Sequence, residues 1–599
     1  MALGNISGIA YVVPDDPGHP DVLPEDTKSI AASIAARLRE WGLRLNERVD
    51  TLTSRVDAMA VASGQAPGTP EDGMVAGFVL DATSKTRSAL TTVFRSILDP
   101  ALEALPETGV LRLEDFGAVC DGVTDDTAAL RAGLAESARL GVPLHLPARD
   151  TIALVGQVNI PVGASIHGHS ATLSWAQTTG AGAWLLNANY AWGSEISDLS
   201  LVVETSASTV QRGFTAVGAG NLTVRNLAVK ATTPGAGSGS ANENGARFEA
   251  AENVSVTGLS VEGFDYAVRV KGLYMSEING FKVKRYRTGL YVTDTTYCTF
   301  RNGDISIKGP NTTQDNGHNG VLIDATGSGL TDMLTLEDVM VADAGATGFR
   351  LGGQNPVTRV SHVRCTAVRC GSNGFKTLGG TVDSGSRHRY IRYVDCTTLD
   401  VGLGGGSNTA GVAVHLSDDV VVSGLTVGTS TVSGYSCRDG VYVAGASRVR
   451  IIAPDIRRPT FAGIAVRSAL GEVSDVSVLG GKVATVDGAN AFDFSWEGTT
   501  FRRVSVEGTK VEHYGTGYVI HARKDAASSL AGPLSVEIAL VNSGAITNVC
   551  TGSGREDVSA RITGPVPSDM SYTGFANGSR WWADDGRLGL RQSGTWRWL

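Results

Sequence analysis

The sequence predicts an all-β fold, a right-handed parallel β-helix with three short strands in each coil and about 12–14 coils. Three observations predict it: the composition, a recurring eight-residue pattern, and a third recurring motif between the copies of that pattern. Glycine accounts for 75 of 599 residues, whereas charged residues make up 19% and aromatic residues 6%. This composition is typical of many short strands joined by tight turns, and it excludes an all-helical protein.

The eight-residue pattern reads apolar-x-apolar-x-(Gly/Asn/Asp)-x-x-apolar, and it predicts two short strands around a tight turn. Gly or Asn at the fifth position supplies the left-handed backbone conformation that the turn requires. Repeats of this length that alternate strand and turn are typical of a solenoid. Copies begin at Leu222, Val254, Ser276, Cys298, Leu334, Thr358, Arg389, Val420, Val449, Val476 and Val504.

A third strand follows in each coil and reads Gly-apolar-x-apolar. Alternation with period two then directs one set of side chains into a stacked interior and the other to solvent. The seven cysteines are scattered, and those at inward positions, including Cys298, Cys365 and Cys396, are predicted to be buried thiols without disulfides. Third-strand motifs begin at Gly289, Gly320, Gly348, Gly411, Gly440 and Gly463.

The chain divides into five predicted segments. Residues 1–29 form a terminal segment, and residues 30–61 form a helical coiled coil whose seam includes Leu38, Leu45 and Leu52. Such a seam requires partner chains, although a helix folded on its own domain is the alternative. Residues 62–110 are a linker with a short helix, residues 111–565 are the β-helix, and residues 566–599 are a tip or cap that holds four of the nine tryptophans.

The segment from Asp115 to Ala148, DFGAVCDGVTDDTAALRAGLA followed by GVPLHLPA, is the most specific motif in the chain. Thr124 is predicted to cap a helix whose first turn holds Asp125 and Asp126, and this helix would close one end of the solenoid. Capping explains these aspartates more simply than metal binding, and we expect no cofactor and no metal.

This segment resembles the opening signature of the pectate-lyase-like β-helix superfamily, with Cys120 and Arg149 in place of two usual glycines. Polysaccharide-cleaving enzymes and phage tailspikes share that signature, and the order of segments is similar to that of a phage tailspike or tail fibre. The resemblance implies a homotrimer on the phage tail, made in the host cytoplasm and acting outside the cell. Residues 1–29 would attach to other tail or baseplate proteins, and the body would bind a host surface polysaccharide.

The resemblance also implies a substrate groove along the third strand. Aligning the Gly-apolar-x-apolar motif places four cations and a tyrosine at one outward position on successive coils, and such a row suits an acidic or hydroxyl-rich glycan. The aligned residues are Arg247, Arg269, Tyr291, Leu322, Arg350 and Lys376, and two positions further on Glu249, Lys271, Thr293, Asp324, Gly352 and Thr377.

Glycoside hydrolysis requires two carboxyl groups. Asp294 and Asp324 lie at the end of the third strand on two adjacent coils, and Glu249 lies two coils away. A lyase would instead use Arg269, Lys271 or Arg350 as its base. The carboxyl pair favours a hydrolase over a lyase. Two alternatives stay open: that the charges only solvate an outer face, and that the chain is a non-catalytic tail protein or adhesin.

Two function classes are disfavoured. With 51 basic and 60 acidic residues, the net charge is −9, which argues against a globally basic nucleic-acid-binding protein. No apolar run is long enough to span a membrane, and the first residues lack the basic region of a secretory signal. We therefore expect no nucleic-acid partner, no membrane insertion and no export by the usual route.

Overall fold

The computed structural model describes residues 110–599 with short gaps. The predicted segments 1–29 and 30–61, and all but the last residue of segment 62–110, lie outside the described residues. The gaps are 176–183, 204–211, 233–243, 307–317, 327–328, 354, 381–385, 404–408, 430–433, 487, 497–499, 514–516, 526–528, 531–533, 543–549, 552, 554–556, 565–578, 584–585 and 593–594.

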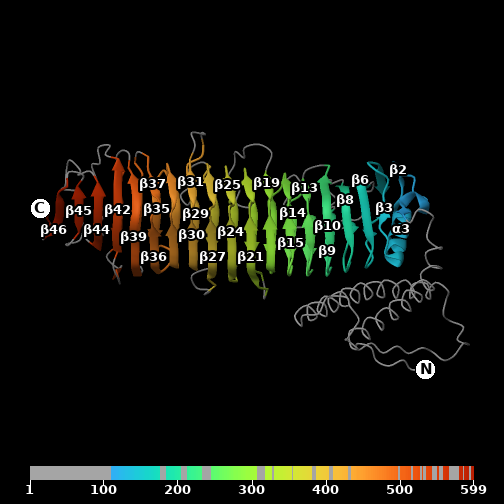
Figure 1. Cartoon of the computed structure of the whole chain (residues 1–599), viewed down its shortest axis with the longest axis horizontal. Helices are drawn as coiled ribbons and strands as arrows, with labels where there is room; N and C mark the ends of the chain where they lie inside the picture. The colour runs from blue at the N-terminus through green and yellow to red at the C-terminus, as the bar shows by residue number, and fades with distance from the viewer. Residues whose placement is uncertain are drawn as a thin grey trace, which may run out of the picture.

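The described chain is an elongated parallel β-helix of the right-handed type with about 13 turns. Successive coils follow one another along the long axis in chain order, as the colours of Figure 1 show. Two sheets run the length of the solenoid, one of 32 strands (sheet 1) and one of 15 strands (sheet 2), both counted over the described residues. The predicted all-β solenoid is therefore confirmed. Within the described residues, no helix is long and apolar enough to cross a membrane.

Sheet 1 receives two short stretches from each coil, and these correspond to the eight-residue pattern. Its strands are β1 (Leu111–Arg112), β2 (Asp121–Asp125), β3 (Leu144–His145), β4 (Thr151–Leu154), β6 (Ser165–Trp175), β8 (Glu195–Val203), β10 (Thr223–Ala231), β12 (Ser255–Thr257), β13 (Ser260–Glu262), β15 (Glu277–Asn279), β16 (Lys282–Lys284), β18 (Thr296–Arg301), β19 (Asp304–Ser306), β21 (Thr331–Glu337), β22 (Met340–Ala342), β24 (Val357–Val363), β25 (Thr366–Val368), β27 (His388–Val394), β28 (Thr397–Leu399), β30 (Ser417–Ser423), β31 (Thr426–Gly428), β33 (Ser447–Ile452), β34 (Asp455–Arg457), β36 (Val473–Leu479), β37 (Lys482–Ala484), β39 (Thr500–Glu512), β41 (Ser529–Leu530), β42 (Leu534–Asn542), β44 (Val558–Gly564), β45 (Arg580–Ala583), β46 (Leu588–Gln592) and β47 (Thr595–Trp598).

Sheet 2 receives one strand from each coil, which is the Gly-apolar-x-apolar motif, and all of its pairings are parallel. Its strands are β5 (Val158–Asn159), β7 (Trp184–Asn187), β9 (Arg212–Val217), β11 (Asn244–Glu249), β14 (Tyr266–Lys271), β17 (Thr288–Thr293), β20 (Val321–Asp324), β23 (Phe349–Leu351), β26 (Phe375–Leu378), β29 (Ala410–His415), β32 (Asp439–Ala444), β35 (Ala462–Arg467), β38 (Asn490–Trp496), β40 (Ile520–Lys524) and β43 (Cys550–Thr551).

The bend between the two stretches of sheet 1 has a left-handed residue at the predicted fifth position in most copies. The copies placed at Thr358 and Arg389, however, begin two residues early, since the bends there are at Arg364 and Asp395. Gly258 has φ +73°, Asn302 has φ +51° and Gly424 has φ +64°. The same conformation recurs at Arg364 and Ala453, where a side chain makes it cost about 1–2 kcal/mol. The fold therefore imposes this corner even where the local sequence does not favour it.

The interior is a continuous stack of apolar and aromatic side chains. Phe349 and Phe375 lie on consecutive strands of sheet 2 with ring centroids 4.7 Å apart. The predicted inward thiols Cys298, Cys365 and Cys396 are buried and free, and burial raises the pKa of each thiol. These cysteines therefore contribute to packing.

Helix α3 (Thr127–Leu140) closes the N-terminal end of the solenoid, as Figure 1 shows. Its buried side chains include Ala129, Leu130 and Leu134. The predicted cap is wrong: the helix begins after Asp126, and Thr124 lies in β2. The Asp126 carboxylate accepts hydrogen bonds from the Val119 and Cys120 N–H groups, so it anchors the preceding loop.

The C-terminal end departs from the parallel pattern. Strands β45, β46 and β47 are joined by antiparallel pairing, unlike the coils before them. Trp581 is fully buried and donates from Nε1 to the Gly564 carbonyl, and Trp596 packs edge-on against it. Trp582 is 43% exposed. One tryptophan thus fills the end of the core, while another is available at the surface.

Candidate functional site on the outward face of sheet 2

The outward face of sheet 2 carries the predicted row of cations. The row residues are consecutive Cα partners across six strands, from Arg247 on β11 to Lys376 on β26. Each is partly exposed and lies between buried residues of its own strand, so these side chains point outward. We call this set the outer row: Arg247, Arg269, Tyr291, Leu322, Arg350 and Lys376.

A second row lies two positions further along each strand. Glu249, Lys271, Thr293 and Asp324 are consecutive partners, as the alignment predicted. Thr377 does not belong to it: it pairs with Leu351, is buried, and its hydroxyl lies 2.5 Å from the Tyr393 hydroxyl inside the core. The alignment placed Thr377 one residue out of phase with its strand.

At the N-terminal end of the face, the charges largely pair with one another. Arg247 donates two hydrogen bonds to Glu249, one of them 2.7 Å from Nε, and Lys271 Nζ lies 3.7 Å from the same carboxylate. Arg212, which the sequence alignment missed, lies 5.5 Å from the Trp184 ring, and burial followed by repulsion from Arg247 lowers its pKa. Glu249 is therefore held in ion pairs.

The centre of the face combines an aromatic pair with free hydrogen-bonding capacity. The Tyr266 and Tyr291 rings lie 5.4 Å apart, and the Arg269 guanidinium lies 6.0 Å from the Tyr291 ring. Burial, followed by the neighbouring Asp324 charge, raises the pKa of Tyr291 to about 12. The Nε atoms of Arg269 and Arg350 have no hydrogen-bond partner among the described residues. Both Nε atoms are buried in this structure, so a ligand reaches them only when the arginine side chains move.

The two predicted catalytic carboxyl groups lie at the ends of adjacent strands. Thr293 pairs with Asp324, and Asp294 follows Thr293 directly in a left-handed conformation with φ +53°. Burial raises the pKa of Asp324, against the opposing effects of the Ala325 N–H and the Arg350 charge. Asp324 is therefore biased toward its protonated form, the form that a general acid requires.

Asp294 has a different environment. Its carboxylate accepts hydrogen bonds of 2.9 Å from both the Thr326 N–H and the Thr326 hydroxyl. These bonds hold the carboxylate against the turn that follows β20, and its own N–H donates to the Thr331 hydroxyl. Each of the two carboxylate oxygens thus accepts one hydrogen bond from Thr326. The two carboxyl groups are thus adjacent but differently solvated.

Glycine permits the approach of the chain to Asp324. Gly353 has φ +108°, and a Cβ atom at this position would overlap Asp324 Oδ1. Two independent constraints therefore require glycine here: the backbone conformation and the space that the carboxylate occupies. The glycine therefore lets the backbone of the next coil approach the Asp324 carboxylate closely.

The sequence analysis missed a second polar cluster further along the same face. Asp493 continues the outer row beyond Lys376, and Arg467 Nε donates to it at 2.8 Å. Asp439 accepts a longer bond of 3.5 Å from the same guanidinium, and His521 Nδ1 lies 2.6 Å from Asp493. This cluster could have been predicted, because extending the alignment through the motifs at Gly440 and Gly463 leads to these residues.

This cluster holds two carboxyl groups whose pKa values are shifted in opposite directions. Burial raises the pKa of Asp439 to about 7, whereas hydrogen bonds from His521 and Arg467 outweigh burial and lower the pKa of Asp493. Both side chains are almost completely enclosed, at 0% and 1% exposure. A substrate does not reach them without movement of the covering groups, so this cluster stabilises the face in the conformation observed.

Lys376 and His415 lie between the centre of the face and this cluster. Burial and the nearby Arg350 charge lower the pKa of Lys376, and burial lowers the pKa of His415 to about 3. The His415 ring packs edge-on against Tyr442, and its Nε2 has no hydrogen-bond partner among the described residues. The neutral imidazole is therefore enclosed in this structure, and its Nε2 is not accessible from the face.

The described residues contain no cluster of three or more His, Cys, Asp or Glu side chains that is arranged to hold a metal ion. On the outward face, the aspartates are interleaved with arginines, which compete with a cation for carboxylate oxygens. The Asp121 carboxylate is likewise used locally, since it accepts hydrogen bonds from Val123 and Thr124.

No protein-family model matches the chain, and no curated protein matches it. Among solved structures, a tailspike protein mutant of E. coli bacteriophage HK620 in complex with pentasaccharide is 12% identical, with TM-score 0.44, covering 75% of this chain and 80% of that one. The pre-mature bacteriophage phi29 gene product 12 is 12% identical, with TM-score 0.47 and coverage of 84% and 77%. The catalytic unit of a GH87 α-1,3-glucanase from Streptomyces thermodiastaticus is 16% identical, with TM-score 0.40 and coverage of 76% and 70%. At these identities the similarity concerns the fold.

Proposed function

We propose that this chain is a phage tail protein of the tailspike kind that binds a host surface polysaccharide along the outward face of sheet 2 and hydrolyses it there. The motif at residues 115–148 supports the class of protein. The face itself supports the ligand, because it presents guanidinium groups, an aromatic pair and two adjacent carboxyl groups on a rigid scaffold.

One observation carries the proposal. Arg269, Tyr291 and Arg350 lie in one row, with Asp324 beside them, and both arginine Nε atoms have no hydrogen-bond partner among the described residues. Buried polar atoms normally find partners, so movement of either arginine toward solvent would let these donors meet ligand oxygens or water. Sugar hydroxyl and carboxylate oxygens match these donors, and sugar faces pack on tyrosine rings.

In the proposed reaction, Asp324 is the general acid. It donates its proton to the glycosidic oxygen as the bond to the anomeric carbon breaks, and the leaving sugar departs with a free hydroxyl group. Asp294 accepts a proton from the attacking water, whose oxygen joins the anomeric carbon. Water is consumed, and each cleavage creates one new reducing end. Arg350 would position the glycan beside Asp324, and Glu249, held by Arg247 and Lys271, would order the arginines upstream.

The test compares Asp324→Asn and Asp294→Asn with wild type, and Asp455→Asn serves as the control. Asp455 lies on β34 in sheet 1 and pairs with Arg457 on its own strand, away from the proposed site. We expect each active-site variant to lose a hundredfold or more of the cleavage rate, while polysaccharide binding persists and Asp455→Asn retains activity. Cleavage at the wild-type rate by Asp324→Asn would overturn the assignment.

A second candidate function is binding without cleavage. It is favoured by Asp294, whose two carboxylate oxygens both hold the Thr326 turn and so already have a structural use. On this alternative, wild-type protein would retain the polysaccharide and release no new reducing ends. The same assay therefore separates an adhesin from a depolymerase.

The proposed tail location includes a homotrimer, assembled through the seam predicted at residues 30–61 and attached to other tail proteins through residues 1–29. Three copies would present three identical faces to the cell surface. Light scattering on the purified full chain should give three times the mass of one chain. A mass of 62.3 kDa, that of a single chain, would contradict the trimer.

A further inference from the structure

A groove runs along a second surface of the solenoid, at the corner where strands of sheet 2 lead into sheet 1. Its larger section has a volume of about 600 Å³ and its neighbour about 330 Å³. Both sections are lined by Tyr390 and Arg392, so they form one continuous groove. Its floor follows consecutive Cα partners on neighbouring coils, namely Ser361, Arg392, Val421, Arg450, Ser477 and Ser505.

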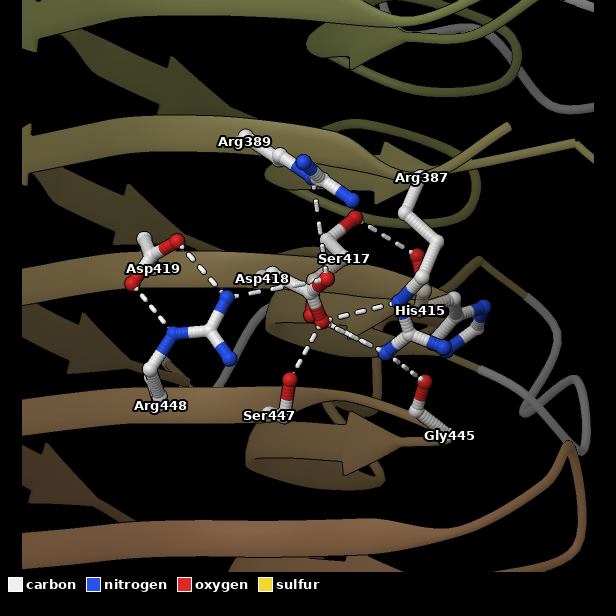
Figure 2. Close-up of polar contacts among 9 residues, drawn as sticks. All are labelled: Arg387, Arg389, His415, Ser417, Asp418, Asp419, Gly445, Ser447 and Arg448. Carbon is white, nitrogen blue, oxygen red and sulfur yellow. Dashed lines mark hydrogen bonds and ion pairs between the residues drawn. The ribbon is translucent and has the colours of Figure 1, made fainter. Parts of the chain in front are cut away.

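The charged residues of the groove wall are paired with one another. Figure 2 shows Arg448 donating two hydrogen bonds to Asp419, of 2.6 and 2.8 Å. In the same view, Arg387 and Arg389 are directed toward the buried Asp418, at 2.8 and 3.8 Å. The Arg448–Asp419 pair neutralises part of that wall, and the ion pairs of Asp418 lie next to it in the chain.

The two arginines of the floor differ from their neighbours. Arg392 and Arg450 are exposed, and neither has an ion pair or a side-chain hydrogen bond with any described residue. They are separated by one intervening strand, which carries Val421. Neighbouring strands lie about 4.8 Å apart, so the two guanidinium groups emerge about 10 Å apart along the solenoid axis.

An aromatic ring and a line of hydroxyl groups complete the groove. Tyr390 has a left-handed backbone with φ +59° and is 55% exposed, where the two sections of the groove meet. Ser477 and Ser505 continue the floor beyond Arg450. An exposed ring packs against the apolar face of a sugar, and hydroxyl groups bond to its rim.

We propose that this groove is a second binding site, for a linear acidic polysaccharide that carries one carboxylate in each disaccharide. The repeat of such a polymer matches the separation of Arg392 and Arg450, and its uncharged sugar lies over Val421 between them. The choice of a glycan rests on the proposed function, whereas the site shares no residue with the outward face of sheet 2. Binding here would hold the polymer parallel to the solenoid axis.

The test measures binding of the full chain to three polymers at low and high salt: hyaluronan, with one carboxylate in each disaccharide, neutral dextran, and single-stranded DNA. Arg392→Ala/Arg450→Ala is the variant, and Arg457→Ala/Lys510→Ala is the control, because it removes the same charge from exposed positions on β34 and β39 of sheet 1. Cleavage by every variant is measured in parallel, because a loss of hyaluronan binding that leaves cleavage unchanged separates this groove from the proposed cleavage site.

We expect wild type to bind hyaluronan in preference to the other two polymers, and salt to weaken that binding. The arginine variant should lose affinity more than tenfold, while the control binds as wild type does. No hyaluronan binding, equal binding of DNA, or unchanged affinity in the arginine variant would overturn the proposal. A change in oligomeric mass of the arginine variant would also overturn it, since the groove would then be an interface between chains.

Discussion

Replacing His362 with Phe should make the fold less sensitive to acid. His362 is fully buried on β24, stacked 4.9 Å from the Tyr393 ring and edge-on to Phe349 and Phe375. Neither ring nitrogen has a hydrogen-bond partner among the described residues, and burial lowers the pKa from 6.5 to about 3. A phenylalanine ring fits among these aromatic neighbours without a polar atom to desolvate.

The linkage between proton binding and folding determines the sign and size of the effect of His362 on the free energy of unfolding. The unfolded chain binds the proton more tightly than the folded chain, so this residue lowers the free energy of unfolding as pH falls below 6.5 and continues to do so down to about pH 3. Each pH unit costs about 1.4 kcal/mol, so moving from about pH 7.5 to about pH 4.5 removes about 3 kcal/mol from wild type through this residue.

The assay is guanidinium denaturation of wild type and His362→Phe at both pH values. Other titrating groups are common to the two proteins, so the difference between them isolates His362. We expect the variant to lose about 3 kcal/mol less than wild type on acidification. An equal loss in both proteins would refute the claim that a neutral, buried imidazole at this position opposes protonation.

Three further substitutions test the structure. Gly353→Ala should abolish cleavage, because the added Cβ would overlap Asp324. Gly163 has a comparable left-handed φ of +75° but open space around it, so Gly163→Ala should leave cleavage intact. Equal cleavage rates in the two variants would contradict this. The pKa of Asp439 is raised to about 7, so its ionisation opposes folding as pH rises. In denaturation experiments between about pH 4 and pH 8, Asp439→Asn should therefore become progressively more stable than wild type. A difference in unfolding free energy that stays constant with pH would contradict the raised pKa. Phe300→Ala leaves a cavity in the fully buried core and should cost about 3–5 kcal/mol of unfolding free energy, and a loss below about 1 kcal/mol would contradict tight packing there.

The coil architecture was predictable because each strand repeats a local rule. A glycine or asparagine marks a bend, and alternation with period two then determines which side chain points inward. The register between Arg269 and Tyr291 follows from aligning one motif. Left-handed bends at Arg364 and Ala453 could not be predicted in this way, since the strands on either side impose them.

The candidate site was only partly predictable. Alignment placed Arg350 and Asp324 on the outward face, but contacts between coils depend on loops whose conformation the repeat does not specify. The hydrogen bonds from Thr326 to Asp294, and the close approach of Gly353 to Asp324, are of this kind. The prediction of the helix start was wrong for a similar reason, because the Asp126 side chain accepts a hydrogen bond from a loop earlier in the chain.

The most direct test of the proposed function is to incubate the purified chain with surface polysaccharides from a panel of candidate hosts. New reducing ends and the ultraviolet absorbance of unsaturated uronate are followed together. We predict that wild type produces new ends without absorbance and that Asp324→Asn produces neither while still binding the polymer. New ends accompanied by absorbance would contradict hydrolysis and identify a lyase, and binding with no new ends from wild type would contradict catalysis altogether.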